Sequence, residues 1–236
     1  MNSVYDILAE LQSMGSESTK RTLLRHGARE PFFGVKVGDM KTIVKRIKKD
    51  HALSLALFDT GNSDAMYLAG LIADEKKISK DELRHWAEKA HWSMLSEYTV
   101  AWVAAESPHG WELALEWIES KQENIASTGW STLSSWVGIR PDAALDLPAL
   151  EKLLDRVAAT IQDKPDRVRY TMNGFVMSVG ISVEPLSQKA LQTGAQLGKL
   201  TINMGDTACA VPFSVDYIQK AINKGHLGHK KKMARC

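Results

Sequence analysis

Cysteine is scarce in this chain: Cys209 and Cys236 are its only two among 236 residues. Two thiols so far apart indicate neither a disulfide framework nor a cysteine-based metal site. We therefore expect reduced thiols, a cytoplasmic location, and no cofactor or metal. Cys209 could be a reactive thiol or a packed core residue. Packing is the favoured interpretation, because a reactive thiol needs a basic neighbour and no histidine is close in sequence.

The chain also lacks long apolar runs. No stretch of eighteen apolar residues occurs, so the sequence predicts no membrane span. The first residues carry Asp6 and Glu10 and lack a basic segment followed by an apolar one. They indicate an amphipathic helix rather than a signal peptide.

Strand signals are almost missing. Residues 200–204 alternate in polarity, but this segment is short and isolated, and it is interpreted as an extended connector. Everywhere else the helical period dominates. The predicted helices cover residues 4–14, 17–26, 40–49, 51–58, 65–73, 80–89, 92–105, 111–119, 125–137, 148–161, 167–179, 185–197 and 214–223.

Polar-faced and apolar helices take turns along the chain. The apolar ones are centred near residues 69, 99, 131 and 173, a spacing of about 30–40 residues that is typical of helical-pair repeats. Because no pair can bury its apolar side alone, the pairs must stack. We predict an all-α superhelix in one domain, 1–236, monomeric and C-shaped, whose apolar helices line a concave groove. A basic, flexible tail is expected from about residue 226.

Charge is uneven although the net charge is only +2. Residues 20–49 carry a net +8 and residues 218–236 a net +6, which leaves about −12 for the rest of the chain. This asymmetry suggests a polyanionic partner, nucleic acid first. The alternative is that the lysines are solvated helix faces. The candidate contacts are Lys41, Lys45, Lys48, Lys49, Lys230, Lys231 and Lys232.

The apolar helices carry few polar and aromatic residues, and these are expected to line the groove. Most of the seven tryptophans fit a core, but Trp92 opens an inner helix beside His91, where its ring can reach the groove. Arg169 and Asn173 lie four residues apart on one helical face and could hold a phosphate. Equally, Arg169 could form a structural ion pair with Asp166.

Three segments together resemble the DNA alkylation repair family. They are Phe33-Gly34-Val35-Lys36-Val37-Gly38-Asp39-Met40-Lys41, the helix Leu68-Ala69-Gly70-Leu71-Ile72-Ala73-Asp74, and the helix that begins at Trp92. The similarity spans roughly residues 20–220. It implies a stack of HEAT-like repeats whose basic concave face cradles DNA, as in the AlkD-like alkylpurine glycosylases. In those enzymes two Trp and one Asp stabilise the developing sugar cation, and an Arg holds the DNA backbone.

Placing those residues on this sequence exposes departures from the family. Trp92 matches one Trp, and Phe175 matches the other. The position of the catalytic Asp falls on Ser96, which has no charge. Glu97 is adjacent, but on a regular helix it would point about 100° away. The backbone Arg falls near Ser127 or Thr128.

Three functions remain open at this point. The first is a DNA-binding protein of this family without efficient glycosylase activity, because a serine dipole does not replace a carboxylate beside an oxocarbenium-like centre. The second is an active glycosylase for 3-methyladenine or 7-methylguanine that uses Glu97. The third is a protein-binding scaffold, which the fold alone cannot exclude.

Overall fold

A computed structural model describes residues 3–235, and all of the regular secondary structure in that range is helical, without a strand. The long helices are α1 (Val4–Met14), α2 (Glu17–Arg25), α3 (Val37–Ile47), α4 (His51–Phe58), α5 (Ser63–Ile72), α6 (Lys80–Lys89), α7 (Ala101–Glu106), α8 (Gly110–Trp117), α9 (Glu123–Ile139), α10 (Leu147–Thr160), α11 (Asp166–Ser182), α12 (Ser187–Leu197) and α13 (Ser214–Asn223). A π-helix, η1 (Leu95–Val100), leads into α7, and short 3₁₀ turns are η2 (Asp142–Ala144), η3 (Ile161–Asp163) and η4 (Glu184–Leu186).

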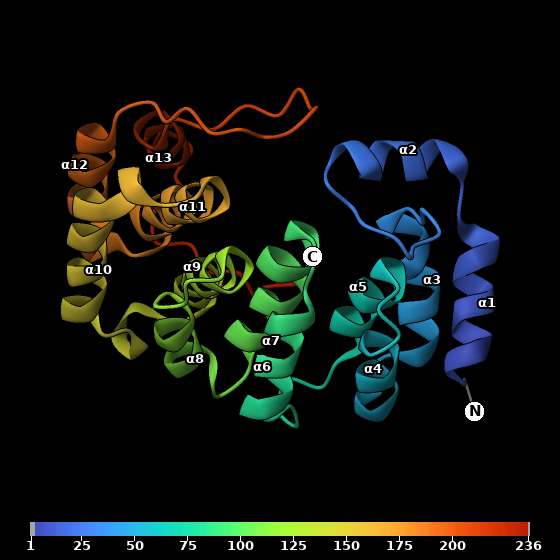
Figure 1. The fold of residues 1–236 in the computed structure, drawn as a ribbon. Helices are drawn as coiled ribbons and strands as arrows, with labels where there is room; N and C mark the ends of the chain where they lie inside the picture. The colour runs from blue at the N-terminus through green and yellow to red at the C-terminus, as the bar shows by residue number, and fades with distance from the viewer. Residues whose placement is uncertain (1–2, 236) are drawn as a thin grey trace.

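The helices form two curved layers, as Figure 1 shows. The inner layer runs through α3, α5, α7, α9, α11 and α13, and the outer layer through α4, α6, α8, α10 and α12. The layers bend so that α2 and α13 flank one open side of the molecule (Figure 1). The predicted all-α, HEAT-like superhelix with a concave inner face is therefore confirmed.

Local sequence signals account for many of the helix ends. Ser3 and Ser79 each form a capping box with the acid three residues on, Asp6 and Glu82. One predicted start was wrong. α3 begins at Val37 rather than after an Asp39 cap, and its N-cap Lys36 makes no side-chain hydrogen bond. Asp39 instead places its carboxylate in the first turn, where the helix dipole favours negative charge.

Two apolar clusters fill the space between the layers. One spans residues from Ile7 to Trp117 and includes Ala234, and the other spans Ala114 to Ile218. Glycine lets the layers approach closely. A Cβ on Gly129 of α9 would lie 2.8 Å from the backbone N of Ile118, beside α8. The two helices can touch only because this side chain is absent.

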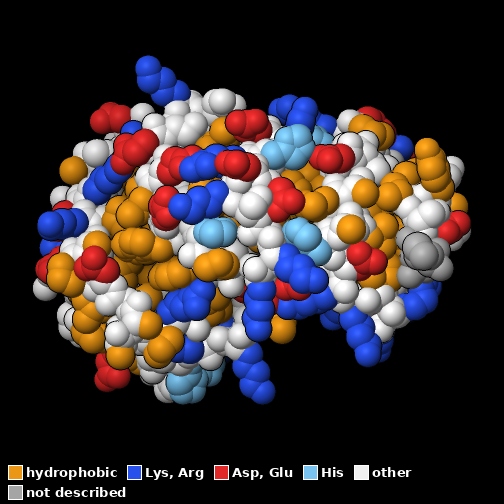
Figure 2. All heavy atoms as spheres, turned by 90° about the horizontal axis from the view of Figure 1, so that it is seen from below, with side chains coloured by type: hydrophobic (Ala, Val, Ile, Leu, Met, Phe, Trp, Pro, Cys, Tyr) orange, Lys and Arg blue, Asp and Glu red, His pale blue; other side chains and the backbone are white. Residues whose placement is uncertain are grey.

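The outer layer is laced by ion pairs between successive helices. Lys80 and Arg84 of α6 bind Glu112 and Glu116 of α8 at 2.6 and 2.7 Å. Figure 2 shows the molecule from below the view of Figure 1. On that side, acidic and basic side chains are mixed over much of the surface, and Lys and Arg side chains protrude along the lower edge of the picture. Over residues 3–235, no helix is long and apolar enough to cross a bilayer.

Candidate functional site

The inner face carries a cavity beside Trp92, which we call the Trp92 cavity. Its volume is about 660 Å³, and it lies between residues 24–29, the N-terminal ends of η1, α9 and α11, and residues 203–206. The Trp92 ring lines it but is only 8% exposed, and its Nε1 donates a hydrogen bond of 2.8 Å to the carbonyl of His26. Trp92 therefore lines the cavity with most of its ring buried, and its contact with DNA stays a prediction.

Ser96 and Glu97 both line the Trp92 cavity. Glu97 also lines a second cavity that Ser96 does not reach, so the two side chains are not equivalent. Residues 95–100, which carry both of them, form a π-helix rather than a regular α-helix. Such π-bulges are frequent at functional sites. The Ser96 hydroxyl is 1% exposed and donates only a long hydrogen bond, 3.5 Å, to the carbonyl of Ser93.

The Glu97 carboxylate is already engaged. Arg167, at the start of α11, donates to it through Nε at 2.8 Å and through a second, shorter bond from Nη2. The same guanidinium lies 4.6 Å from the ring centre of Tyr170. Burial raises the pKa of the Glu97 carboxyl, and the hydrogen bonds from Arg167 oppose that increase. A carboxylate held in this way is a poor substitute for a free catalytic one.

Two of the residues expected at the groove are placed elsewhere. Phe175 is fully buried and packs on Trp130 with ring centres 5.4 Å apart, because its position on α11 faces the layer interior. Asn173 is 1% exposed, and its Nδ2 donates a hydrogen bond of 2.9 Å to the carbonyl of Pro212. Neither side chain is accessible to a ligand in this structure. Both expectations are corrected accordingly.

Arg169 matches the structural alternative rather than the phosphate site. Its Nη1 lies 3.3 Å from Asp166 Oδ1, one turn earlier on α11, and its Nη2 lies 3.4 Å from the Gln162 side chain. The guanidinium therefore makes its hydrogen bonds within and just before the N-terminal region of α11. Three arginines line the Trp92 cavity, namely Arg25, Arg29 and Arg167, and Arg167 is the one on α11 that sequence reasoning missed.

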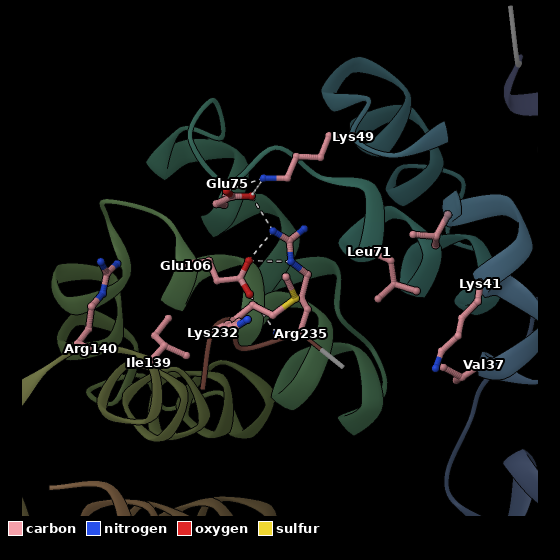
Figure 3. A pocket seen from close by; sticks show the side chains of 12 residues that line it. Val37, Lys41, Lys49, Leu71, Glu75, Glu106, Ile139, Arg140, Lys232 and Arg235 are labelled. Carbon is pink, nitrogen blue, oxygen red and sulfur yellow. Dashed lines mark hydrogen bonds and ion pairs between the residues drawn. The ribbon is translucent and has the colours of Figure 1, made fainter. Parts of the chain in front are cut away.

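The lysines of the basic helix α3 are solvent-exposed. Lys41, Lys45 and Lys48 have open side chains, whereas Lys49 forms a 2.5 Å ion pair with Glu75. Lys41 also lines a cavity of about 460 Å³ that we call the tail cavity, shown in Figure 3. Five of its lining residues are cationic and two acidic: Lys41, Lys49, Arg140, Lys232, Arg235, Glu75 and Glu106.

The basic C-terminal segment packs against the fold instead of hanging free. The Lys230 side chain lies 2.7 Å from the Asp142 carboxylate and donates a hydrogen bond to the carbonyl of Val137. The backbone N–H of Lys231 donates a hydrogen bond to the carbonyl of Gly138. Lys231 and Lys232 remain exposed. The expected flexible tail is corrected over residues 230–235, because these residues satisfy the carbonyls left open at the C-terminal end of α9. Cys236 lies outside the described residues.

Arg235 closes this segment onto the N-terminal half of the chain. Its guanidinium, 8% exposed, donates to Glu106 and Glu75 and to the carbonyls of Gly70 and Ala73 (Figure 3). Burial alone would raise the pKa of Glu75, but hydrogen bonds from Lys49 and Arg235 lower it to about 2. No signal in the sequence pattern pointed to this cluster, because its members are 129 and 160 residues apart.

A third cavity lies at the middle of the inner face, and we call it the tyrosine cavity. It has a volume of about 480 Å³ and is lined by Tyr98, Trp102, Tyr170 and Tyr217 together with hydroxyl-bearing residues of α9 and α11. Glu97 lines both this cavity and the Trp92 cavity, so the two adjoin at this residue. Cys209, expected to pack in the core, is instead exposed on the connector before α13.

Two layers of stacked helix pairs around such a groove define a HEAT-like repeat protein. The family model described as DNA alkylation repair enzyme matches residues 7–236, and the chain belongs to that family.

Similar proteins were found by sequence and by structure. "Uncharacterized protein Lmo0209" of Listeria monocytogenes is 34% identical over 221 residues, which cover 91% of this chain and 95% of the relative. "Uncharacterized protein Lin0241" of Listeria innocua is 33% identical with the same coverage. A solved structure described as "A new family of proteins related to the HEAT-like repeat DNA glycosylases with affinity for branched DNA structures" is 37% identical, has a TM-score of 0.92, and covers 99% of this chain and 100% of its own.

Proposed function

We propose that this protein binds DNA on its concave inner face, prefers branched DNA to linear duplex, and does not excise alkylated bases efficiently. One observation carries the proposal: the 37% identical structure that covers 99% of this chain is described as having affinity for branched DNA. At a TM-score of 0.92 the two chains share the same groove-forming layers. Branched-DNA affinity is therefore the property to measure in this chain.

The lysines of α3 and the tail supply the cations that a DNA backbone requires. Lys41, Lys45 and Lys48 are exposed, and Lys41 lines the tail cavity together with Lys232. The Trp92 cavity is electrically balanced instead, since Arg25, Arg29 and Arg167 face Glu97, Glu123 and Asp206. We infer that phosphates are held mainly at the tail-cavity end of the groove.

Binding of a four-way junction and of a linear duplex, measured by fluorescence anisotropy at several salt concentrations, tests the proposal. The junction should bind at least tenfold more tightly, and log Kd should rise linearly with log salt through counterion release. Replacing Lys41, Lys45 and Lys48 together with Gln should lower the steepness of that line by about 2–3, close to 0.9 for each lost phosphate contact.

A matched control removes the same charge from the outer layer. Lys80, Lys152 and Lys189 lie on α6, α10 and α12, and replacing them with Gln should leave both the affinity and the salt dependence unchanged. Equal losses in the two triple variants would show that overall charge, not the inner face, is responsible. Equal affinity of the unaltered protein for junction and duplex would remove the branched-DNA preference.

Weak excision is supported by the chemistry of the Trp92 cavity. Stabilising a developing cation needs a preorganised negative charge, and a serine hydroxyl at Ser96 supplies only a dipole. One observation favours the alternative of an active alkylpurine glycosylase, namely that Glu97 lines the cavity beside Trp92. Incubation of excess protein with methylated DNA should release no 3-methyladenine or 7-methylguanine above a buffer control. Release that disappears in Glu97→Gln would establish the glycosylase instead.

We further propose that the protein acts as a monomer in the cytoplasm. An exposed thiol at Cys209 fits a reducing compartment. DNA, the proposed ligand, also lies inside the cell. Light scattering of the purified protein should give the mass of one chain, 26.2 kDa. A measured mass twice as large would contradict the monomer and indicate a dimer.

A further inference from the structure

The tyrosine cavity has the composition of a stacking site. Tyr217 on α13 is 52% exposed and Tyr98 on η1 is 37% exposed, so two rings reach the open space. Tyr98 packs edge-on against Trp102, with ring centres 5.4 Å apart and planes at 80°. Trp102 also packs edge-on against Tyr67, with ring centres 6.3 Å apart, so Tyr98 belongs to a small aromatic cluster. Aromatic faces of this kind bind planar rings, including nucleobases of any sequence.

The floor of this cavity is kept open by a glycine that packing does not require. A Cβ built on Gly174 of α11 meets no atom within 4 Å. On the same helix, a Cβ on Gly180 would collide with Ile218 at 2.5 Å. Glycine is among the poorest residues in a helix interior, and neither packing nor a positive φ explains Gly174. Its missing side chain enlarges the cavity, which points to an occupant.

The polar groups of the cavity suit a base and its phosphate. Ser131, Ser134, Ser135 and Ser178 bring hydroxyls that can both donate and accept hydrogen bonds, as the edges of bases require. Among the lining residues Lys231 is the cation, and Glu97, the acid, is neutralised by Arg167. An exposed Lys231 beside an otherwise uncharged cavity complements a planar ring inside and a phosphate at the rim.

We propose that the tyrosine cavity binds one unpaired nucleobase of a DNA strand, stacked beside Tyr217 and Tyr98 with its phosphate near Lys231. This proposal rests on the proposed function. It adds a second recognised feature of the DNA, an unpaired nucleotide next to the branch point. Because Glu97 lines both this cavity and the Trp92 cavity, the two adjoin, and the base would lie next to the Trp92 cavity. The volume of about 480 Å³ lies within the range of about 300–1,000 Å³ that small planar ligands occupy in proteins.

Two DNA probes test this inference on the full-length protein. The first is a fully paired four-way junction, and the second is the same junction with an added single-stranded arm of five thymidines. One stacked base should strengthen binding on the order of tenfold. The unaltered protein should therefore prefer the second probe by that factor.

Gly174→Leu fills the cavity from its floor, and Tyr217→Ala removes an exposed stacking ring. Both variants should bind the two junctions equally, while the affinity for the fully paired junction stays the same. Because leucine is a better helix former than glycine, Gly174→Leu should melt no lower than the unaltered protein. Gly38→Leu is the control: it lies on α3, a Cβ there also meets no atom, and it lines none of the three cavities.

The outcomes separate the two proposals. An unchanged preference in a folded Gly174→Leu overturns the base site, whatever the paired junction does. Failure of the unaltered protein to bind the paired junction counts against the proposed function. Then a single-stranded oligonucleotide with one 2-aminopurine decides the base site: fluorescence quenched by the unaltered protein but not by Gly174→Leu supports it, and no quenching overturns it. Adenosine monophosphate that competes as well as the oligonucleotide would overturn a DNA-strand site in favour of a free nucleotide.

Discussion

Glu75 shows how single residues couple distant parts of this chain. It accepts hydrogen bonds from Lys49 of the α3–α4 connection and from Arg235 near the C-terminal end of the described chain. Opposite charges on two sides hold the pKa of this carboxyl at about 2, although burial acts in the opposite direction. Its ionised form therefore stabilises the folded state at neutral pH.

The Glu75→Gln variant should be less stable than the unaltered protein at pH 7, by about 1–2 kcal/mol once solvent screening is allowed for. Because the folded-state pKa lies below the ordinary value of 4.5, this contribution is complete above about pH 5 and is lost as the pH falls toward 2. Urea unfolding of both proteins from pH 7 to pH 3 measures the difference. A gap that does not narrow on acidification would contradict the assignment.

Residues such as Asp64 mark the limit of what the sequence could predict. The sequence predicts a helix over residues 65–73, whereas α5 begins at Ser63 and is capped by Asn62. Asp64 is instead buried and accepts hydrogen bonds from the N–H groups of Phe33, Gly34 and Val35 at 2.6, 3.0 and 3.2 Å. Those donors lie about thirty residues away, so no local rule of capping or spacing could reveal them. The same holds for Arg167 with Glu97 and for Arg235 with Glu75.

At the scale of elements, sequence periodicity was a good guide. The helices at residues 51–58, 80–89 and 214–223 were predicted with the observed ends, because apolar spacing and caps are local signals. Placement of site residues was less successful. Phe175 matched a family position, yet the rotation of α11 turns it into the core. The rotation of α11 about its own axis depends on how it packs against α9, and a single sequence does not determine that packing.

Two glycines of α9 give an element-level prediction. Gly129→Ala forces a methyl group to within 2.8 Å of the Ile118 backbone N and should destabilise the protein by about 2 kcal/mol through overpacking against α8. Gly138→Ala, on the same helix, meets no atom within 4 Å and should be neutral or stabilising by roughly 0.5 kcal/mol. Thermal melting of the two variants should move in different directions. Equal losses would show that α8 and α9 do not pack as described.

At the scale of the whole molecule, the C-terminal segment joins the two apolar clusters. Ala234 packs within the N-terminal cluster, while α13 packs within the other. Residues 230–235 therefore cross from one half of the superhelix to the other. A linear stack of repeats has contacts only between neighbours, and this bridge adds a long-range one.

Truncation after His229 should break that bridge. Loss of Arg235 leaves the buried carboxylate of Glu106 without its arginine and leaves Glu75 with Lys49 alone, at a cost of about 3–5 kcal/mol and roughly 10 °C in Tm. Hydrogen exchange should rise most at the C-terminal end of α5, whose Gly70 and Ala73 carbonyls lose their donor. Arg235→Lys retains the charge but not the fork of donors, and it should recover only part of the stability. Unchanged exchange at α5 would contradict the bridge.

The Arg235 cluster also imposes an order on folding during synthesis. Glu75 is made 160 residues before Arg235 and Glu106 is made 129 residues before it. At about 5–20 residues per second, the N-terminal half spends on the order of ten seconds without the arginine that closes it. During that interval Glu106 lacks the arginine that binds it in the folded protein, whereas Lys49 is already available to Glu75. The cluster reaches its final charge only after Arg235 has been translated.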